Sequence, residues 1–212
     1  MSGVTEGDLP RLGARPDTPP AGNPTCVIYV VRHGEAGDGT WPLPATAPLS
    51  PAGRAQARRA AGELASRVAS GTRIFASDLL RCRETAETIV EALQGTLVLD
   101  HRLRELDFGW EALDGQEVLR RVGEDRLARF LRDPAGDGLP GAEHFLVFWE
   151  RVRAAAATAV RISSAGEIVL VAHDGVNRAL SLLARGLGPK GWPEVPPWRH
   201  GEVRALAWPR SL

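Results

Sequence analysis

Hydrophobic residues in this chain fall into short unbroken runs separated by longer stretches of mixed polarity. The runs at 26–31 and 167–172 are rich in valine and isoleucine and too short for typical helices. Such runs are typical of parallel strands that are covered on both faces of a sheet. Shorter apolar runs predict further strands at 73–76, 96–99 and 203–208, with the last near a sheet edge.

The stretches between these runs carry helix signals. Ser50 is a good N-cap and Pro51 a good first helical residue, and Ser77 or Asp78 is expected to cap the next helix. Amphipathic spacing predicts a helix over 115–132, broken at Gly123, and the helix over 145–162 has an aromatic core face. The last helix is expected to begin at Val176. Strands that alternate with helices indicate an α/β fold.

Length and composition indicate one domain of ordinary size. The chain has 212 residues, of which 43% are hydrophobic and 25% charged, and this is enough to build a sizeable core. We expect the domain to span 25–212. The leader 1–24 is rich in Pro, Gly and Asp, which predicts disorder.

Charge and hydropathy argue against several partners. The formal net charge is +0, so bulk charge gives no reason to expect a nucleic-acid partner. No apolar run approaches the ~20 residues of a membrane span, and the leader lacks the apolar segment of a secretory signal. Cys26 and Cys82 lack metal-ligand spacing and are interpreted as free thiols in a reducing compartment, so we expect a cytoplasmic protein without a metal site. The sequence indicates no oligomeric state.

Two of the predicted strands end in a histidine. Arg32, His33 and Gly34 follow the first run, and His173 follows the run at 167–172. The carboxyl ends of parallel strands are where open α/β sheets place their ligand sites. An arginine beside a histidine favours the neutral, nucleophilic imidazole and can hold an anion, while a glycine permits close backbone approach. The pattern therefore suits attack on an anionic substrate.

This signature resembles the Arg-His-Gly motif of the histidine phosphatase superfamily, also called the phosphoglycerate-mutase-like family. Three further stretches resemble later family motifs in the right order. The first is LSPAGRAQA, a structural helix. The second contains Ser77, Arg81, Thr85 and Ala86, and the third contains Leu103, Glu105, Gly109, Trp110 and Glu111. The final motif is matched by Val171, His173, Gly175 and Arg178. The resemblance covers most of 27–178 and implies a three-layer α/β/α sandwich with a central, mostly parallel sheet.

The resemblance also implies roles for individual residues. His33 would be phosphorylated transiently, and Glu105 would donate a proton to the leaving oxygen, with Asp107 as the alternative acid. Arg32, Arg81, His173 and Gly34 would bind the phosphate group. His144 could touch substrate, although a capping or surface role suits it better.

The chain departs from the family pattern at three places. Gly39 and Thr40 stand near the place of the asparagine that usually contacts phosphate in the family. The loop at 109–112 is one residue shorter than usual, and Ala112 replaces its glycine. Asp174 also replaces a glycine. Asp174 brings a negative charge toward the phosphate unless it faces away or pairs with Arg178.

These motifs predict a phosphomonoesterase that acts on a small phosphorylated metabolite through phosphohistidine, without a metal or cofactor. The alternative activities are phosphoglycerate mutase and protein phosphohistidine phosphatase. The mutases usually carry a different third motif where ELDFG stands here, and the compact phosphohistidine phosphatases often lack the acid. A non-catalytic phosphate-binding protein is the alternative of another class.

Overall fold

The computed structural model describes residues 25–209, except 38–41, 111–112, 137 and 164–165. The predicted leader and the positions Gly39, Thr40 and Ala112 therefore lie outside the described residues. The elements in chain order are β1 (Thr25–Arg32), α1 (Pro51–Ala65), β2 (Arg73–Ala76), α2 (Leu80–Leu93), β3 (Thr96–Leu99), the 3-10 helix η1 (His101–Leu103), α3 (Gly115–Val122), α4 (Glu124–Arg132), α5 (Phe145–Ile162), β4 (Glu167–Ala172), α6 (Asp174–Ala184), the 3-10 helix η2 (Pro189–Glu194) and β5 (Val203–Pro209).

The strands form one five-stranded sheet in the order β3-β2-β4-β1-β5. The pairs β1–β4, β2–β4 and β2–β3 are parallel, and β5 is an antiparallel edge strand against β1. This confirms the mostly parallel sheet and the edge position of the last strand. Because the parallel strands point the same way, their carboxyl ends meet at one edge of the sheet.

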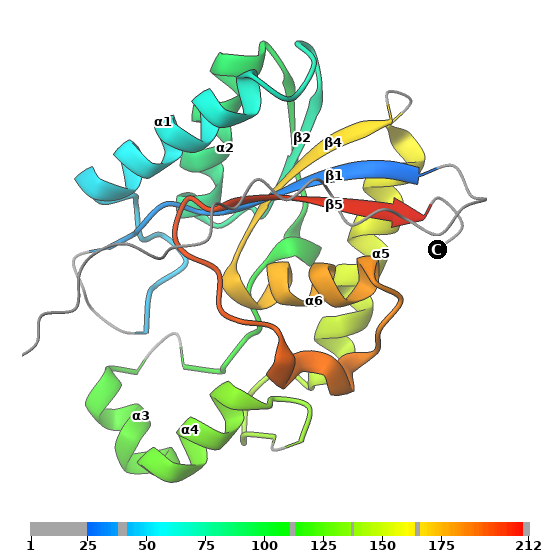
Figure 1. The fold of residues 1–212 in the computed structure, drawn as a ribbon. Helices are drawn as coiled ribbons and strands as arrows, with labels where there is room; N and C mark the ends of the chain where they lie inside the picture. The colour runs from blue at the N-terminus through cyan, green and yellow to red at the C-terminus, as the bar shows by residue number, and fades with distance from the viewer. Residues whose placement is uncertain (1–24, 38–41, 111–112, 137, 164–165, 210–212) are drawn as a thin grey trace, which may run out of the picture.

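Helices cover both faces of the sheet (Figure 1). Tyr29 and Val31 of β1 pack with the core of α1 and α2, whereas Ile28 and Val30 pack with that of α5 and α6. Successive side chains of a strand point to opposite faces, so a strand buried on both sides must be apolar throughout. This alternation confirms the three-layer α/β/α sandwich. The α3–α4 pair lies beyond α6 in the view and joins the same core through Val118, Leu127 and Phe130.

Two helix starts differ from the sequence prediction. The N-cap of α2 is Leu79, without a side-chain cap bond, because Ser77 hydrogen-bonds His173 and Asp78 pairs with Arg104. Helix α6 begins at Asp174, with His173 as its N-cap, rather than at Val176. The predicted break at Gly123 is confirmed: its φ of 80° separates α3 from α4. No helix among the described residues is both long and apolar enough to cross a membrane.

Gly34 brings the end of β1 against the first turn of α1. A Cβ on Gly34 would overlap the backbone of Gly53, and one on Gly53 would overlap the backbone of Glu35. The Gly34 N–H donates to Thr85 Oγ1 at 3.1 Å. The close approach that this glycine permits is therefore to a helix. Its expected contact with phosphate stays a prediction. The Gly34 N–H already donates to Thr85, so it is not free to donate to a phosphate oxygen.

We expect Gly34→Ala to lower the free energy of unfolding by about 1–3 kcal/mol, since the added methyl must push α1 away from β1. The matched control is Gly62→Ala on the exposed side of α1, where a Cβ meets nothing within 4 Å. That change should stabilise the helix by about 0.5–1 kcal/mol. Urea unfolding of both variants checks the pair, and equal stabilities would contradict the packing role of Gly34.

Candidate active site

The two strand-end histidines meet at the carboxyl edge of the sheet. Arg32 pairs with Ala172 in the register of β1 and β4, and the His33 N–H donates to the Ala172 carbonyl at 3.0 Å. The His33 and His173 rings that follow lie with their centroids 5.1 Å apart, edge to face. Neighbouring parallel strands therefore bring together two residues that are far apart in the sequence.

His33 is held in one tautomer. Its Nδ1 lies 2.7 Å from the Gly34 carbonyl oxygen. A carbonyl only accepts hydrogen bonds, so Nδ1 carries the proton and Nε2 keeps its lone pair. Burial holds the pKa of His33 well below its ordinary value, and the Arg81 and Arg32 charges lower it further. The imidazole is therefore neutral at physiological pH, and burial contributes more to this than the neighbouring arginine that the sequence pointed to.

His173 is fully enclosed behind His33. Its Nε2 lies 3.0 Å from Ser77 Oγ and 3.4 Å from Cys82 Sγ. Burial lowers the pKa of His173, as do the nearby His33 and Arg81. Burial also raises the pKa of the Cys82 thiol, which therefore stays protonated beside the imidazole. Ser77 thus positions a histidine instead of capping a helix.

Two guanidinium groups face the histidines. Arg81, in the first turn of α2, is only 6% exposed and donates to the Pro44 carbonyl at 3.3 Å. Arg32 donates to the carbonyl of Trp198. Both charges act on His33 and on His173. Arg32, Arg81, His33 and His173 therefore lie together, and the two guanidinium groups make their surroundings positively charged.

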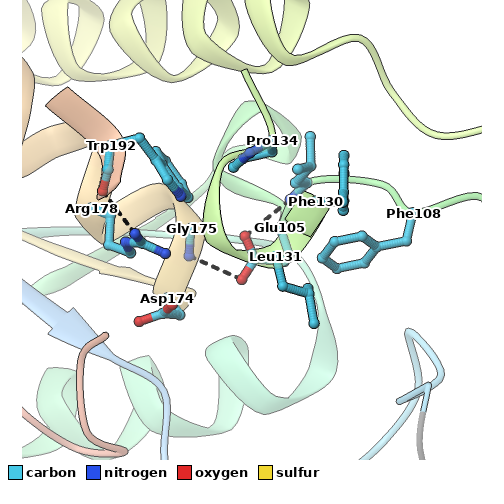
Figure 2. Close-up of a pocket in the computed structure, with 10 residues that line it drawn as sticks. Glu105, Phe108, Phe130, Leu131, Pro134, Asp174, Gly175, Arg178 and Trp192 are labelled. Atoms are coloured by element: carbon cyan, nitrogen blue, oxygen red, sulfur yellow. Dashed lines mark hydrogen bonds between the residues drawn. The ribbon is translucent and has the colours of Figure 1, made fainter. Parts of the chain in front are cut away.

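Glu105 approaches the same site from the segment after η1. Its Oε2 accepts from the Gly175 N–H at 3.1 Å, and its Oε1 accepts from the Leu106 N–H at 3.0 Å (Figure 2). Burial raises the pKa of Glu105, although the two N–H donors and Arg32 oppose the rise. Asp107 is exposed and accepts from the Gly109 N–H in its own turn. Of the two carboxylates, Glu105 is therefore the one with a raised pKa and a place near the Arg32 charge.

Arg151 of α5 holds the segment that carries Glu105. Its guanidinium donates to the carbonyls of Arg102, Arg104 and Glu105 at 2.6–2.9 Å and pairs with Glu143 at 2.7 Å. Sequence reasoning missed this residue, because nothing within α5 distinguishes it from other helical arginines. It is a positioning residue for the candidate acid.

The other motif residues have structural partners. Asp174 accepts from the Trp198 N–H at 2.6 Å. Arg178 makes no hydrogen bond to Asp174. It donates instead to the Trp192 carbonyl at 2.8 Å and stacks 4.2 Å from the Trp192 ring centroid. His144 is the N-cap of α5 and accepts from the Leu146 N–H, which agrees with a capping role.

Comparison with known protein families identifies the superfamily of this chain. The model of the histidine phosphatase superfamily (branch 1) matches residues 28–210, which include every strand-end residue described above. The chain belongs to this superfamily. Membership of this superfamily supports a phosphatase or a mutase activity.

Relatives within the superfamily carry both kinds of name. The chain is 33% identical over 175 residues to a probable phosphoglycerate mutase of Salmonella paratyphi C, with 79% of this chain and 77% of the relative covered. Among solved structures, it resembles mycobacterial hydrolase 2 with a TM-score of 0.74, at 28% identity over 86% of this chain and 82% of that one. A mycobacterial glucosyl-3-phosphoglycerate phosphatase gives a TM-score of 0.72 at 26% identity, with 87% and 99% covered.

A small cavity of about 70 Å³ adjoins the Glu105 carboxylate. Its walls are mostly apolar and come from the segment after η1, the end of α4, the start of α6 and Trp192 (Figure 2). They include Phe108, Phe130, Leu131 and Pro134, while Asp174 and Arg178 supply polar groups. The Glu105 carboxylate lines the cavity, whereas His33 and His173 do not. Among the described residues, no cluster of three or more His, Cys, Asp or Glu could hold a metal ion.

Proposed function

We propose that the chain is a phosphomonoesterase that hydrolyses small phosphate esters through a phosphohistidine on His33, without a metal ion. The observation that carries the proposal is the His33 tautomer: Nδ1 is hydrogen-bonded to Gly34, and the Nε2 lone pair is beside two guanidinium groups. A neutral imidazole is a nucleophile, and fixed cations stabilise the charge on a transferring phosphoryl group. Both requirements are met at one sheet edge.

The reaction has two steps. In the first, the Nε2 lone pair of His33 forms a bond to phosphorus, the bond from phosphorus to the ester oxygen breaks, and the Glu105 carboxyl gives its proton to that oxygen. In the second, a water attacks phosphorus, its proton passes to the Glu105 carboxylate, and the bond from phosphorus to nitrogen breaks. Arg32, Arg81 and the Nδ1 of His173 hold the non-bridging oxygens throughout, because phosphoryl transfer depends mainly on positioning and charge stabilisation.

The second candidate function is a phosphoglycerate mutase, which the names of the curated relatives favour. A mutase would return the phosphoryl group to another hydroxyl of a bound product, whereas a phosphatase gives it to water. Most of the walls beside Glu105 are apolar, which favours a phosphatase that accepts apolar alcohols, whereas the Arg178 guanidinium in the same walls would suit the carboxylate of a phosphoglycerate.

Phosphate release from a panel of esters, measured with a chelator present, tests the proposal. We expect release from several esters, with higher kcat/KM for 2-phenylethyl phosphate than for glycerol 1-phosphate because the apolar walls favour an apolar alcohol. Interconversion of 2- and 3-phosphoglycerate with 2,3-bisphosphoglycerate present, faster than phosphate release from any ester, would assign the mutase. Binding of inorganic phosphate without release from any ester would indicate a binding protein.

A further inference from the structure

A third histidine reaches the phosphoryl-transfer site from the segment between η2 and β5. The His200 ring centroid lies 5.4 Å from that of His33, almost as close as the ring of His173. His200 is half-buried, and its charge would act directly on His33. No family motif in the sequence pointed to this residue, because it stands outside all of them.

The backbone on both sides of His200 is tied to the site. On one side, the Gly201 N–H donates to the Arg32 carbonyl at 3.0 Å and to the His33 carbonyl at 3.3 Å. On the other, the Trp198 N–H donates to Asp174 Oδ1 at 2.6 Å, and the Trp198 carbonyl accepts from the Arg32 guanidinium. The Trp198 ring is 1% exposed, with the Arg204 guanidinium 4.1 Å from its centroid. His200 is therefore held against His33 by fixed contacts.

The ring nitrogen of His33 that Gly34 does not bind determines what His200 can meet. Nδ1 of His33 is bonded to Gly34, so a phosphorus atom must approach Nε2, within ~3–3.5 Å for attack. A phosphoryl group at that distance has its non-bridging oxygens to the sides of the line from Nε2 to phosphorus. A ring 5.4 Å away lies within reach of such an oxygen.

We propose that His200 is a further phosphate-binding residue, which donates an N–H to a non-bridging oxygen of the substrate, and that Asp174 is the positioning residue for its segment. The inference rests on the proposed function and adds a donor to the clamp of Arg32, Arg81 and His173. It also gives the carboxylate at position 174 a structural role, because Asp174 accepts from the Trp198 N–H and anchors the loop.

The charges around His200 are compatible with this role. Burial lowers the pKa of His200, the Arg32 charge lowers it further, and Glu35 and Asp174 oppose that change. The ring is therefore neutral at physiological pH. A neutral imidazole still carries one N–H, which is sufficient for the proposed hydrogen bond.

The affinity for inorganic phosphate, measured by calorimetry, tests the role of His200 independently of turnover. We expect His200→Ala to weaken phosphate binding and to lower kcat/KM by about tenfold or more, the scale of a lost hydrogen bond to a charged group. His200→Asn, which keeps an N–H donor, should recover part of the loss. His101→Ala, at an exposed histidine of η1, is the matched control and should bind phosphate as the wild type does.

Unchanged phosphate affinity and unchanged kcat/KM in a folded His200→Ala would overturn the proposal, whether or not the wild type hydrolyses esters. If the wild type binds phosphate but hydrolyses no ester, the proposed function fails, and the affinities of the His200 variants still decide the role of His200. Thermal unfolding of each variant separates a lost contact from a lost fold.

Asp174→Asn and Asp174→Gly test the positioning role. Asparagine keeps an oxygen that can accept from the Trp198 N–H, whereas glycine removes the acceptor. We expect the asparagine variant to bind phosphate at least as tightly as the wild type and the glycine variant to bind it about tenfold more weakly, by the same hydrogen-bond scale. Equal affinities of the two variants would remove Asp174 from the proposal.

Discussion

Replacing His33 by alanine is expected to lower phosphate release by about 10⁵-fold or more, the scale seen when a covalent nucleophile is removed. The reason is that the proposed mechanism needs the Nε2 lone pair of His33, whose Nδ1 is bound to the Gly34 carbonyl. His173 cannot replace it, since its Nε2 lies against Ser77 and Cys82. The measurement is steady-state release from the best ester of the panel.

The same variant should no longer accumulate phosphoenzyme. Rapid mixing with a labelled ester and an alkaline quench should trap label on the wild type and on His101→Ala, but not on His33→Ala. Label on the His33 variant would place the phosphoryl group on another residue. Turnover within tenfold of wild type in a folded His33→Ala would refute the covalent mechanism altogether.

Glu105→Gln is expected to slow hydrolysis of alkyl phosphates by about 10²–10⁴-fold, the usual contribution of a general acid. An alkoxide is a poor leaving group unless it is protonated, whereas 4-nitrophenolate leaves without help. The loss should therefore be much smaller for 4-nitrophenyl phosphate. A plot of the mutant's rate against the acidity of the leaving alcohol should be steeper than that of the wild type.

The pH profile gives a second reading of Glu105. The acid must be protonated in the first step, and burial raises its pKa, so kcat/KM should be high below that raised value and fall as the pH increases through it. Glutamine carries no titrating proton, so this alkaline limb should disappear in Glu105→Gln. His33 should add no acidic limb near its ordinary pKa, because burial and the two arginines hold its pKa well below that value.

Asp107→Asn is the matched control for the acid, since it neutralises an exposed carboxylate two residues away. We expect its activity to stay within about threefold of wild type, as befits a surface change that leaves the Glu105 donors in place. A large, leaving-group-dependent loss in Asp107→Asn, together with a small one in Glu105→Gln, would transfer the acid role to Asp107.

Much of the candidate site could be predicted from the chain because its parts lie at the ends of predictable strands. The runs before His33 and His173 are apolar throughout, so they predict buried parallel strands, and parallel strands end at one edge. Arg81 follows β2 in the same way. The positions of these residues thus depend on local pattern and on the topology that the pattern implies.

Residues that act through distant contacts were not predictable in this way. Ser77 looked like a helix cap, but its hydroxyl lies beside His173, which follows another strand. Arg151 looked like any helical arginine until α5 packed beside the Glu105 segment. Asp174 looked like a charge opposed to phosphate until the loop before β5 placed the Trp198 N–H against it.

The sequence by itself therefore determined the layers, the strand ends and the histidines, arginines and glutamate that meet there, because hydrophobic period and motif order are properties of neighbouring residues. Only the tertiary structure decided which side chains hold those groups in place and that His200 joins them. Hydrogen bonds between segments far apart in the chain depend on how the elements pack, and a local pattern carries no record of that packing.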